Sequence, residues 1–64
     1  MQVKDYDTSS SVSFEVILQE AEAFASTEWD MEFVSDLKDK YEAYGSNMYI
    51  SDKQIQQLER IANL

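Results

Sequence analysis

The sequence predicts an all-α protein, a compact three-helix bundle with a polar N-terminal arm. The 64-residue chain contains no proline and a single glycine, so few positions interrupt a helix. Apolar residues recur at helical spacing in three stretches, and each stretch follows a serine or threonine suited to cap a helix. Because one small domain without cysteine has no disulfides, regular helix packing or a partner must supply its stability.

Residues 1–12, MQVKDYDTSSSV, are polar and include a run of serines at 9–11. We expect them to form a mobile arm, or at most a short strand around Val3 and Tyr6, while residues 13–64 form the helical domain. The segment has no apolar core typical of a secretion signal, and no run of about 18 apolar residues occurs in the chain. The expected location is therefore the cytoplasm.

The first helix is expected at about residues 14–25. Ser13 is the predicted N-cap, and Glu15 lies in the first turn, where a negative charge favours the helix dipole. Helical spacing predicts one inward face, made of Phe14, Ile17, Leu18, Ala21, Phe24 and Ala25.

The second helix is expected at about residues 28–44. Its start fits a capping box from Thr27 to Asp30, and Gly45 stands where a helix commonly ends. The predicted inner stripe is Trp29, Phe33, Leu37, Tyr41 and Tyr44, with Val34 beside it. For Trp29, which leads this stripe, the alternative is an exposed indole that stacks on a ligand.

The third helix lies in the stretch YISDKQIQQLERIA, residues 49–62. Ser51 and Gln54 form a predicted capping box, and Ile50 can pack on Ile55 across the start of the helix. The inward side is then Ile55, Leu58 and Ala62, with Ile61 adjoining. The bundle is expected to close around Trp29, Phe24, Phe33, Leu37 and Leu58.

Charge is the strongest functional signal in the chain. The net charge is −8, and residues 1–32 carry eight acids against one base, Lys4. A deficit of lysine and arginine argues against binding nucleic acid or anionic membranes and favours a basic protein partner. We expect the partner contacts to include Glu15, Glu20, Glu22, Glu28, Asp30 and Glu32. The alternative interpretation is a solvated helix face whose acids match the helix dipole.

No catalytic, metal or cofactor site is expected. The chain has neither cysteine nor histidine, which removes the ligands that transition metals prefer. Pairs of carboxylates one helical turn apart, such as Glu28 and Glu32, are common on any acidic helix. We therefore expect a protein that is not an enzyme and binds no cofactor.

Tyrosines cluster around the loop that follows the second helix. Tyr44, Met48 and Tyr49 are expected to be exposed, and Tyr44 and Tyr49 to anchor a partner, because tyrosine is enriched at the centres of interfaces. Tyr41 is expected in the core. In the alternative, all of these rings complete the small core.

Residues 29–62 resemble a short helical module of bacteriophage and mobile-element proteins, with the pattern W-x3-F-V-x2-L, a loop, then S-x-K-Q-x3-L-x2-I. The matching residues, in about half of the chain, are Trp29, Phe33, Val34, Leu37, Ser51, Lys53, Gln54, Leu58 and Ile61. The resemblance implies a phage or mobile-element origin, and hence a bacterial host cell. In size and charge the chain is also broadly similar to small acidic phage anti-defence proteins of the anti-CRISPR and anti-restriction type, some of which mimic DNA.

The predicted function is that of a phage-type interaction protein. It would bind a basic host or phage nucleic-acid-binding protein through its acidic surface and inhibit or modulate it. Two alternatives stay open. One is a self-associating structural module, such as a homodimer; the other is a small DNA-binding regulator, which would need a more basic helix than the third one offers.

Overall fold

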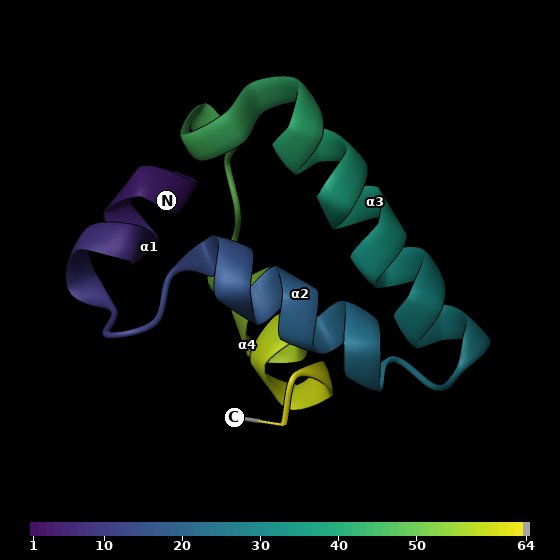
Figure 1. Ribbon diagram of the computed structural model, residues 1–64. Coiled ribbons are helices and arrows are strands. Elements are labelled where there is room, and N and C mark those ends of the chain that lie inside the picture. The colour runs from purple at the N-terminus through teal and green to yellow at the C-terminus, as the bar shows by residue number, and fades with distance from the viewer. Residues whose placement is uncertain (64) are drawn as a thin grey trace.

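The computed structural model describes residues 1–63 and confirms an all-α chain within them. It contains four α-helices and one turn of 3-10 helix: α1 (Val3–Ser9), α2 (Phe14–Phe24), α3 (Glu28–Tyr44), η1 (Gly45–Asn47) and α4 (Asp52–Ile61). Figure 1 shows this order. The architecture thus has one helix more than the expected bundle of three, because a helix forms in the segment expected to be a polar arm.

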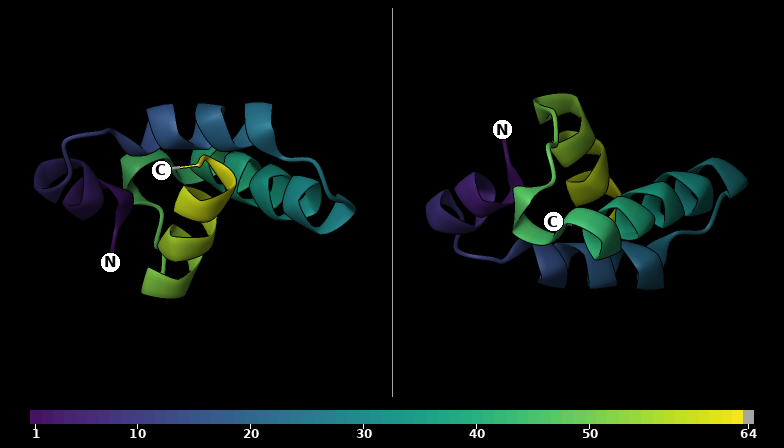
Figure 2. Two further views of the ribbon diagram at one scale, coloured as in Figure 1. Left: turned by 90° about the horizontal axis from the view of Figure 1, so that it is seen from below. Right: turned by 90° about the horizontal axis from the view of Figure 1, so that it is seen from above.

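The central helix of the fold is α2. It packs against both α3 and α4, and both views of Figure 2 show α2 along one side with α3 and α4 on the other. The short α1 lies at one end of the molecule, where it contacts η1 and the start of α2. The result is a two-layer arrangement with the core between α2 and its neighbours.

Helix α1 corrects the prediction of an arm. Val3 is fully buried and Tyr6 nearly so, and both belong to the same apolar core as the other helices. The amide of Val3 donates to the carbonyl of Met48 at 2.9 Å, and the amide of Ile50 donates to the carbonyl of Met1 at 2.7 Å. A seven-residue helix is unstable alone, so these contacts with a distant part of the chain stabilise it.

Most of the predicted core of α2 and α4 is confirmed. Leu58 is fully buried, and the other buried side chains expected on these helices are Phe14, Ile17, Leu18, Ala21, Ile55, Ile61 and Ala62. At the C-terminal end of α2 the prediction is wrong, since 55% of Phe24 is exposed. Ala25, the C-cap of the helix, is only partly buried.

The inner stripe of α3 also differs from the prediction. Its buried positions are Asp30, Val34 and Leu37, whereas Trp29 is 56% exposed and Tyr44 is 65% exposed. Leu37 is buried as predicted, so the inward face is turned toward Asp30 and Val34 by about 50°, half the angle between consecutive residues. Buried Val34 and Leu37 fix this rotation, and it leaves a large aromatic side chain in solvent.

The local signals at the helix starts are confirmed. The side chains of Ser13 and Thr27 accept hydrogen bonds from the amides of Val16 and Asp30, at 3.3 and 3.0 Å. Ser51 and Gln54 form the complete reciprocal capping box on α4. In α3 the carboxylate of Asp30 pairs with Arg60 at 3.0 Å, in place of the expected return bond to Thr27.

The breaks between helices follow from local chemistry as well. Gly45 has a φ of +59°, a conformation that residues with a Cβ rarely adopt, and it ends α3. The amide of Phe14, in the first turn of α2, donates to the carboxylate of Asp7 at 2.7 Å. This bond satisfies a free donor at the helix start and ties α1 to α2.

Candidate interaction surface

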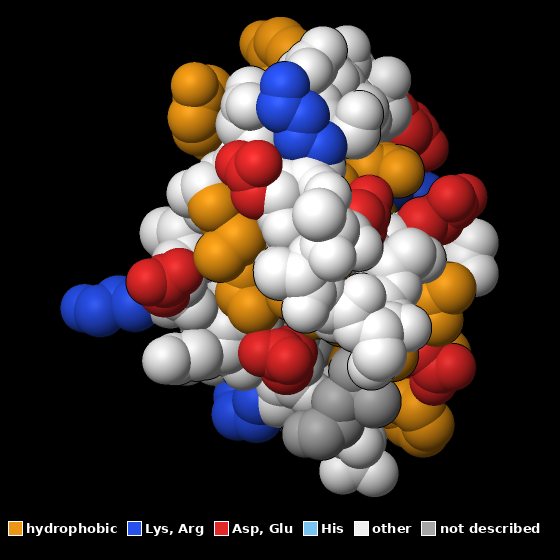
Figure 3. Space-filling view, turned by 90° about the vertical axis from the view of Figure 1, so that its left-hand side faces the viewer, with side chains coloured by type: hydrophobic (Ala, Val, Ile, Leu, Met, Phe, Trp, Pro, Cys, Tyr) orange, Lys and Arg blue, Asp and Glu red, His pale blue; other side chains and the backbone are white. Residues whose placement is uncertain are grey.

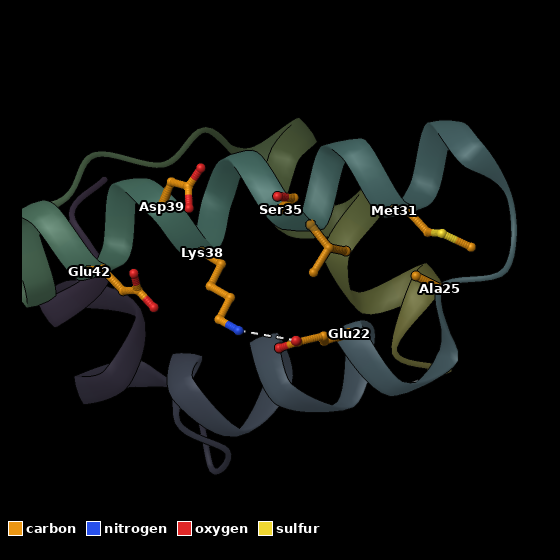
Figure 4. A pocket seen from close by; sticks show the side chains of 8 residues that line it. Glu22, Ala25, Met31, Ser35, Lys38, Asp39 and Glu42 are labelled. Carbon is orange, nitrogen blue, oxygen red and sulfur yellow. Dashed lines mark hydrogen bonds and ion pairs between the residues drawn. The ribbon is translucent and has the colours of Figure 1, made fainter.

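A hollow with a volume of about 670 Å³ lies between α2 and α3. Figure 4 shows Lys38 reaching from α3 across this groove toward Glu22 on α2, with Nζ and Oε1 3.1 Å apart. The lining side chains are Glu22, Ala25, Met31, Val34, Ser35, Lys38, Asp39 and Glu42. We call this hollow the α2–α3 groove.

The α2–α3 groove carries one cation among three carboxylates. The hydrogen bond and the charge of Glu22 raise the pKa of Lys38 above its ordinary value of 10.5, and the charges of Glu42 and Asp39 add to this effect. The ion pair itself is solvated, because about half of each side chain is exposed. Such a pair contributes little to stability. Because Glu22, Asp39 and Glu42 surround the single ammonium group of Lys38, the groove keeps a net negative charge.

Glu15 extends this acidic region toward the start of α2. A smaller hollow of about 180 Å³ adjoins the groove, with Glu15 and Tyr41 among its lining residues. Tyr41 packs on Phe14, and burial, then the charges of Glu15 and Asp7, raise its pKa above the ordinary value of 10.0. The structure therefore brings Glu15 and Glu22 to one side of α2, as their seven-residue spacing requires.

The remaining expected partner contacts are dispersed. Glu20 is exposed but lies about 140° around α2 from Glu15. Glu28 and Glu32 are exposed at the N-terminal end of α3. Asp30 is 8% exposed and bonded to Arg60, so the structure does not offer its carboxylate to a partner.

Tyr44 and Tyr49 lie at the other end of α3. They are 65% and 77% exposed, and with Lys40, Asn47 and Met48 they line a hollow of about 430 Å³. The expectation that Met48 is exposed is wrong, since its side chain is buried in the core. The length of α3, about 24 Å at 1.5 Å per residue, separates them from Glu28. A partner that contacts both ends must therefore cover the whole helix.

The face that carries α1 has no continuous acidic patch. Figure 3 shows its acidic side chains separated by uncharged ones, with lysine or arginine among them. The negative charge of the molecule is thus spread over several faces, and no single face holds all of the expected partner contacts.

Sequence reasoning missed two features of α3. Asp39 and Glu42 join the α2–α3 groove from the half of the chain that is nearly neutral, and their three-residue spacing from each other was the available signal. Trp29 and Phe33 stack on each other at the surface, with ring centroids 5.2 Å apart and planes 7° apart. A prediction that placed Asp30 on the inward face of α3 would have left Trp29 and Phe33 together at the surface. Sequence alone does not favour that prediction, because aspartate is rarely buried.

Residues 1–63 contain no cluster of three or more carboxylates arranged to hold a metal ion. None of the helices described is both long and apolar enough to cross a bilayer. Comparisons with models of protein families, with curated proteins and with solved structures returned no match. The resemblance to a phage helical module stays a prediction.

Proposed function

We propose that this protein is a non-enzymatic interaction protein that binds a basic surface of a nucleic-acid-binding protein and inhibits or modulates it. The observation that carries the proposal is the exposure of the acids. Eleven of the thirteen acidic side chains are exposed, while two of the five basic ones, Lys38 and Arg60, are already paired within the fold. Carboxylates that lack neighbouring cations attract lysine and arginine on a partner and speed its association.

The same charges disfavour a direct role in binding DNA. A DNA-reading helix needs free lysine and arginine for phosphates and bases. Helix α4 offers Lys53 beside Asp52, and its Arg60 is bonded to Asp30. The proposed partner is therefore the protein that binds nucleic acid, in the manner of the small acidic phage proteins that the chain resembles in size and charge.

The test is capture of a partner from bacterial lysate at low and high salt, identified by mass spectrometry. The bait is the tagged protein or a variant with Glu15, Glu20, Glu28 and Glu32 changed to glutamine. A matched control changes four exposed uncharged side chains to alanine: Ser11, Gln19, Ser26 and Gln56. A nucleic-acid-binding protein retained by the wild type and the control, but lost at high salt and with the glutamine variant, is the expected result.

Equal capture by the wild type and the glutamine variant at low salt would contradict the role of the acids.

A second candidate, a self-associating module, is favoured by a different observation. Phe24, Trp29 and Met31, around the α2–α3 turn, are each more than half exposed. A dimer in light scattering that dissociates in a Trp29→Ala variant, together with no captured partner, would replace the proposed function with this one.

A further inference from the structure

Trp29 and Phe33 form a stacked aromatic pair at the surface of α3. The two residues are one turn apart on α3, and their rings lie nearly parallel with centroids 5.2 Å apart. Trp29 is 56% exposed, whereas Phe33 is partly buried against the core. Phe33 thus holds the indole in place while leaving much of it accessible to a ligand.

The side of this end of α3 that carries Trp29 is exposed, whereas its opposite side meets Arg60 of α4 at Asp30. Figure 2 shows the N-terminal end of α3, with the loop before it, projecting beyond α4. At this end, α3 is joined to α4 by the ion pair of Asp30 and Arg60. A large aromatic side chain left in solvent forgoes the free energy of burial that a core position would give it. An exposed, supported tryptophan is instead typical of an interface anchor.

Two carboxylates lie on the same helical face as the rings. Glu32 follows Trp29 by three residues, and Asp36 follows Phe33 by three and Glu32 by four. Residues at these spacings are neighbours on a helix surface. Both acids are exposed, and neither forms an ion pair within residues 1–63. Lys40, four residues after Asp36, adjoins this face without forming an ion pair with it in the described part of the chain, so the aromatic platform keeps a net negative charge beside it.

We propose that this face of α3, made of Trp29, Phe33, Glu32 and Asp36, binds an arginine-bearing segment of the basic partner. A guanidinium group is planar and cationic, so it stacks on an aromatic ring while its N–H groups donate to carboxylates. Lysine carries the same charge on a compact ammonium group, which cannot stack on a ring as the planar guanidinium does. The inference rests on the proposed function and supplies its anchor point.

Charge complementarity selects this occupant over a second copy of the chain. Two copies meeting through the same face would oppose Glu32 and Asp36 with their own counterparts, which is unfavourable in a symmetric contact. The alternative anchors, Tyr44 and Tyr49, surround a hollow that includes Lys40, and this cation repels an arginine. The anchor therefore lies at the N-terminal end of α3, away from the tyrosines.

The test uses hexa-arginine and hexa-lysine peptides as probes. Trp29 is the single tryptophan of the chain, so its fluorescence reports directly on this face. We expect hexa-arginine to produce a saturable change in the emission of Trp29 at low salt, and hexa-lysine to bind more weakly. No saturable change with hexa-arginine would overturn the proposed anchor.

Paired variants separate a local site from overall charge. Glu32→Gln with Asp36→Asn and the control Glu15→Gln with Glu20→Gln both lower the negative charge by two. We expect the first pair to weaken hexa-arginine binding about two- to fivefold more than the control. Equal weakening by both pairs would overturn the anchor and leave only non-specific attraction.

Truncation of the ring gives an independent readout by calorimetry. Trp29→Ala should weaken hexa-arginine binding, Trp29→Phe should restore part of it, and Val16→Ala, at an exposed apolar position of α2, should leave it unchanged. Circular dichroism checks that each variant stays folded. If Trp29→Ala binds as tightly as Val16→Ala, the anchor is wrong. Should the wild type still capture a basic partner in that case, the proposed function survives without the anchor; if no partner is captured, the proposed function fails on its own test.

Discussion

At the scale of single residues, Tyr41 makes the alkaline stability of the fold predictable. Burial first, and then the charges of Glu15 and Asp7, raise its pKa above the ordinary value of 10.0. The unfolded chain therefore loses the phenol proton before the folded chain does, so the free energy of unfolding falls as pH rises above about 10. Lys38, whose pKa is also raised, adds stability below its ordinary 10.5 that is lost as pH rises further.

A Tyr41→Phe variant isolates the contribution of the phenol. It keeps the ring against Phe14, whose centroid lies 5.3 Å away, and leaves Lys38 untouched. Urea unfolding of both proteins between about pH 8 and pH 11 should show a smaller alkaline loss for the variant. Parallel curves across this range would mean that ionisation of Tyr41 is not coupled to folding.

Single residues also show where sequence reasoning stops. Leu37 is predicted in the core and is buried, but Trp29, on the same expected stripe, is exposed. The periodicity of α3 allows two inward faces, one through Trp29 and Phe33 and one through Asp30 and Val34. Hydrophobicity favours the first. The second is realised because Val34 and Leu37 pack together in the core while Arg60, thirty residues away, compensates the buried Asp30.

At the scale of elements, the pair of Asp30 and Arg60 joins two helices that otherwise pack mainly on α2. The Asp30 side chain is 12% exposed and that of Arg60 is 56% exposed, with 3.0 Å between the bonded atoms. Replacing Arg60 with glutamine leaves the carboxylate buried without its partner. We expect the free energy of unfolding to fall by about 1–3 kcal/mol, measured by chemical denaturation.

A double-mutant cycle with Asp30→Asn checks that the loss belongs to the pair. The combined variant should lose less stability than the sum of the two single variants, because removing the second partner also removes the buried charge. Lys38→Gln, which breaks the solvated pair with Glu22, serves as the control and should change stability little. Additive losses from Arg60 and Asp30 would show that the two side chains are not coupled.

The elements that could be predicted are those with local signals. Ser13, Thr27 and Ser51 each accept a bond from the backbone three residues later, so the sequence alone marks where α2, α3 and α4 begin. No serine or threonine precedes Val3 in the first helix, α1, and only Val3 and Tyr6 face inward. Its local bond at the start, from the amide of Gln2 to the carboxylate of Asp5 at 3.1 Å, begins at a glutamine, which is not a typical N-cap residue. Its stability comes from residues about 45 positions away, which a local pattern does not reveal.

At the scale of the whole molecule, the sequence indicates that the surface is acidic but not which acidic residues lie together. An acidic surface follows from the net charge of −8, which needs no structure. The grouping of Glu22 with Asp39 and Glu42 depends on how α2 meets α3, and the exposed Trp29 depends on the rotation of α3. Both are outcomes of packing between elements, so sequence spacing within one helix cannot supply them.

The last prediction concerns α1 as part of the cooperative fold. Val3 is fully buried, and its amide is bonded to Met48 in the segment between α3 and α4. Val3→Ala should lower the free energy of unfolding by about 2 kcal/mol, a large share of the roughly 3–10 kcal/mol available to a domain of this size. Thr8→Ala, at an exposed position of the same helix, is the matched control and should be nearly neutral. Unfolding in urea is followed by the fluorescence of Trp29. Because Trp29 lies at the far end of the molecule from α1, its signal reports whether a change in α1 alters the unfolding of the whole fold. If Val3→Ala and Thr8→Ala unfold at the same urea concentration, residues 3–9 are an appendage; if the midpoint seen at Trp29 shifts with Val3 alone, all four helices unfold as one unit.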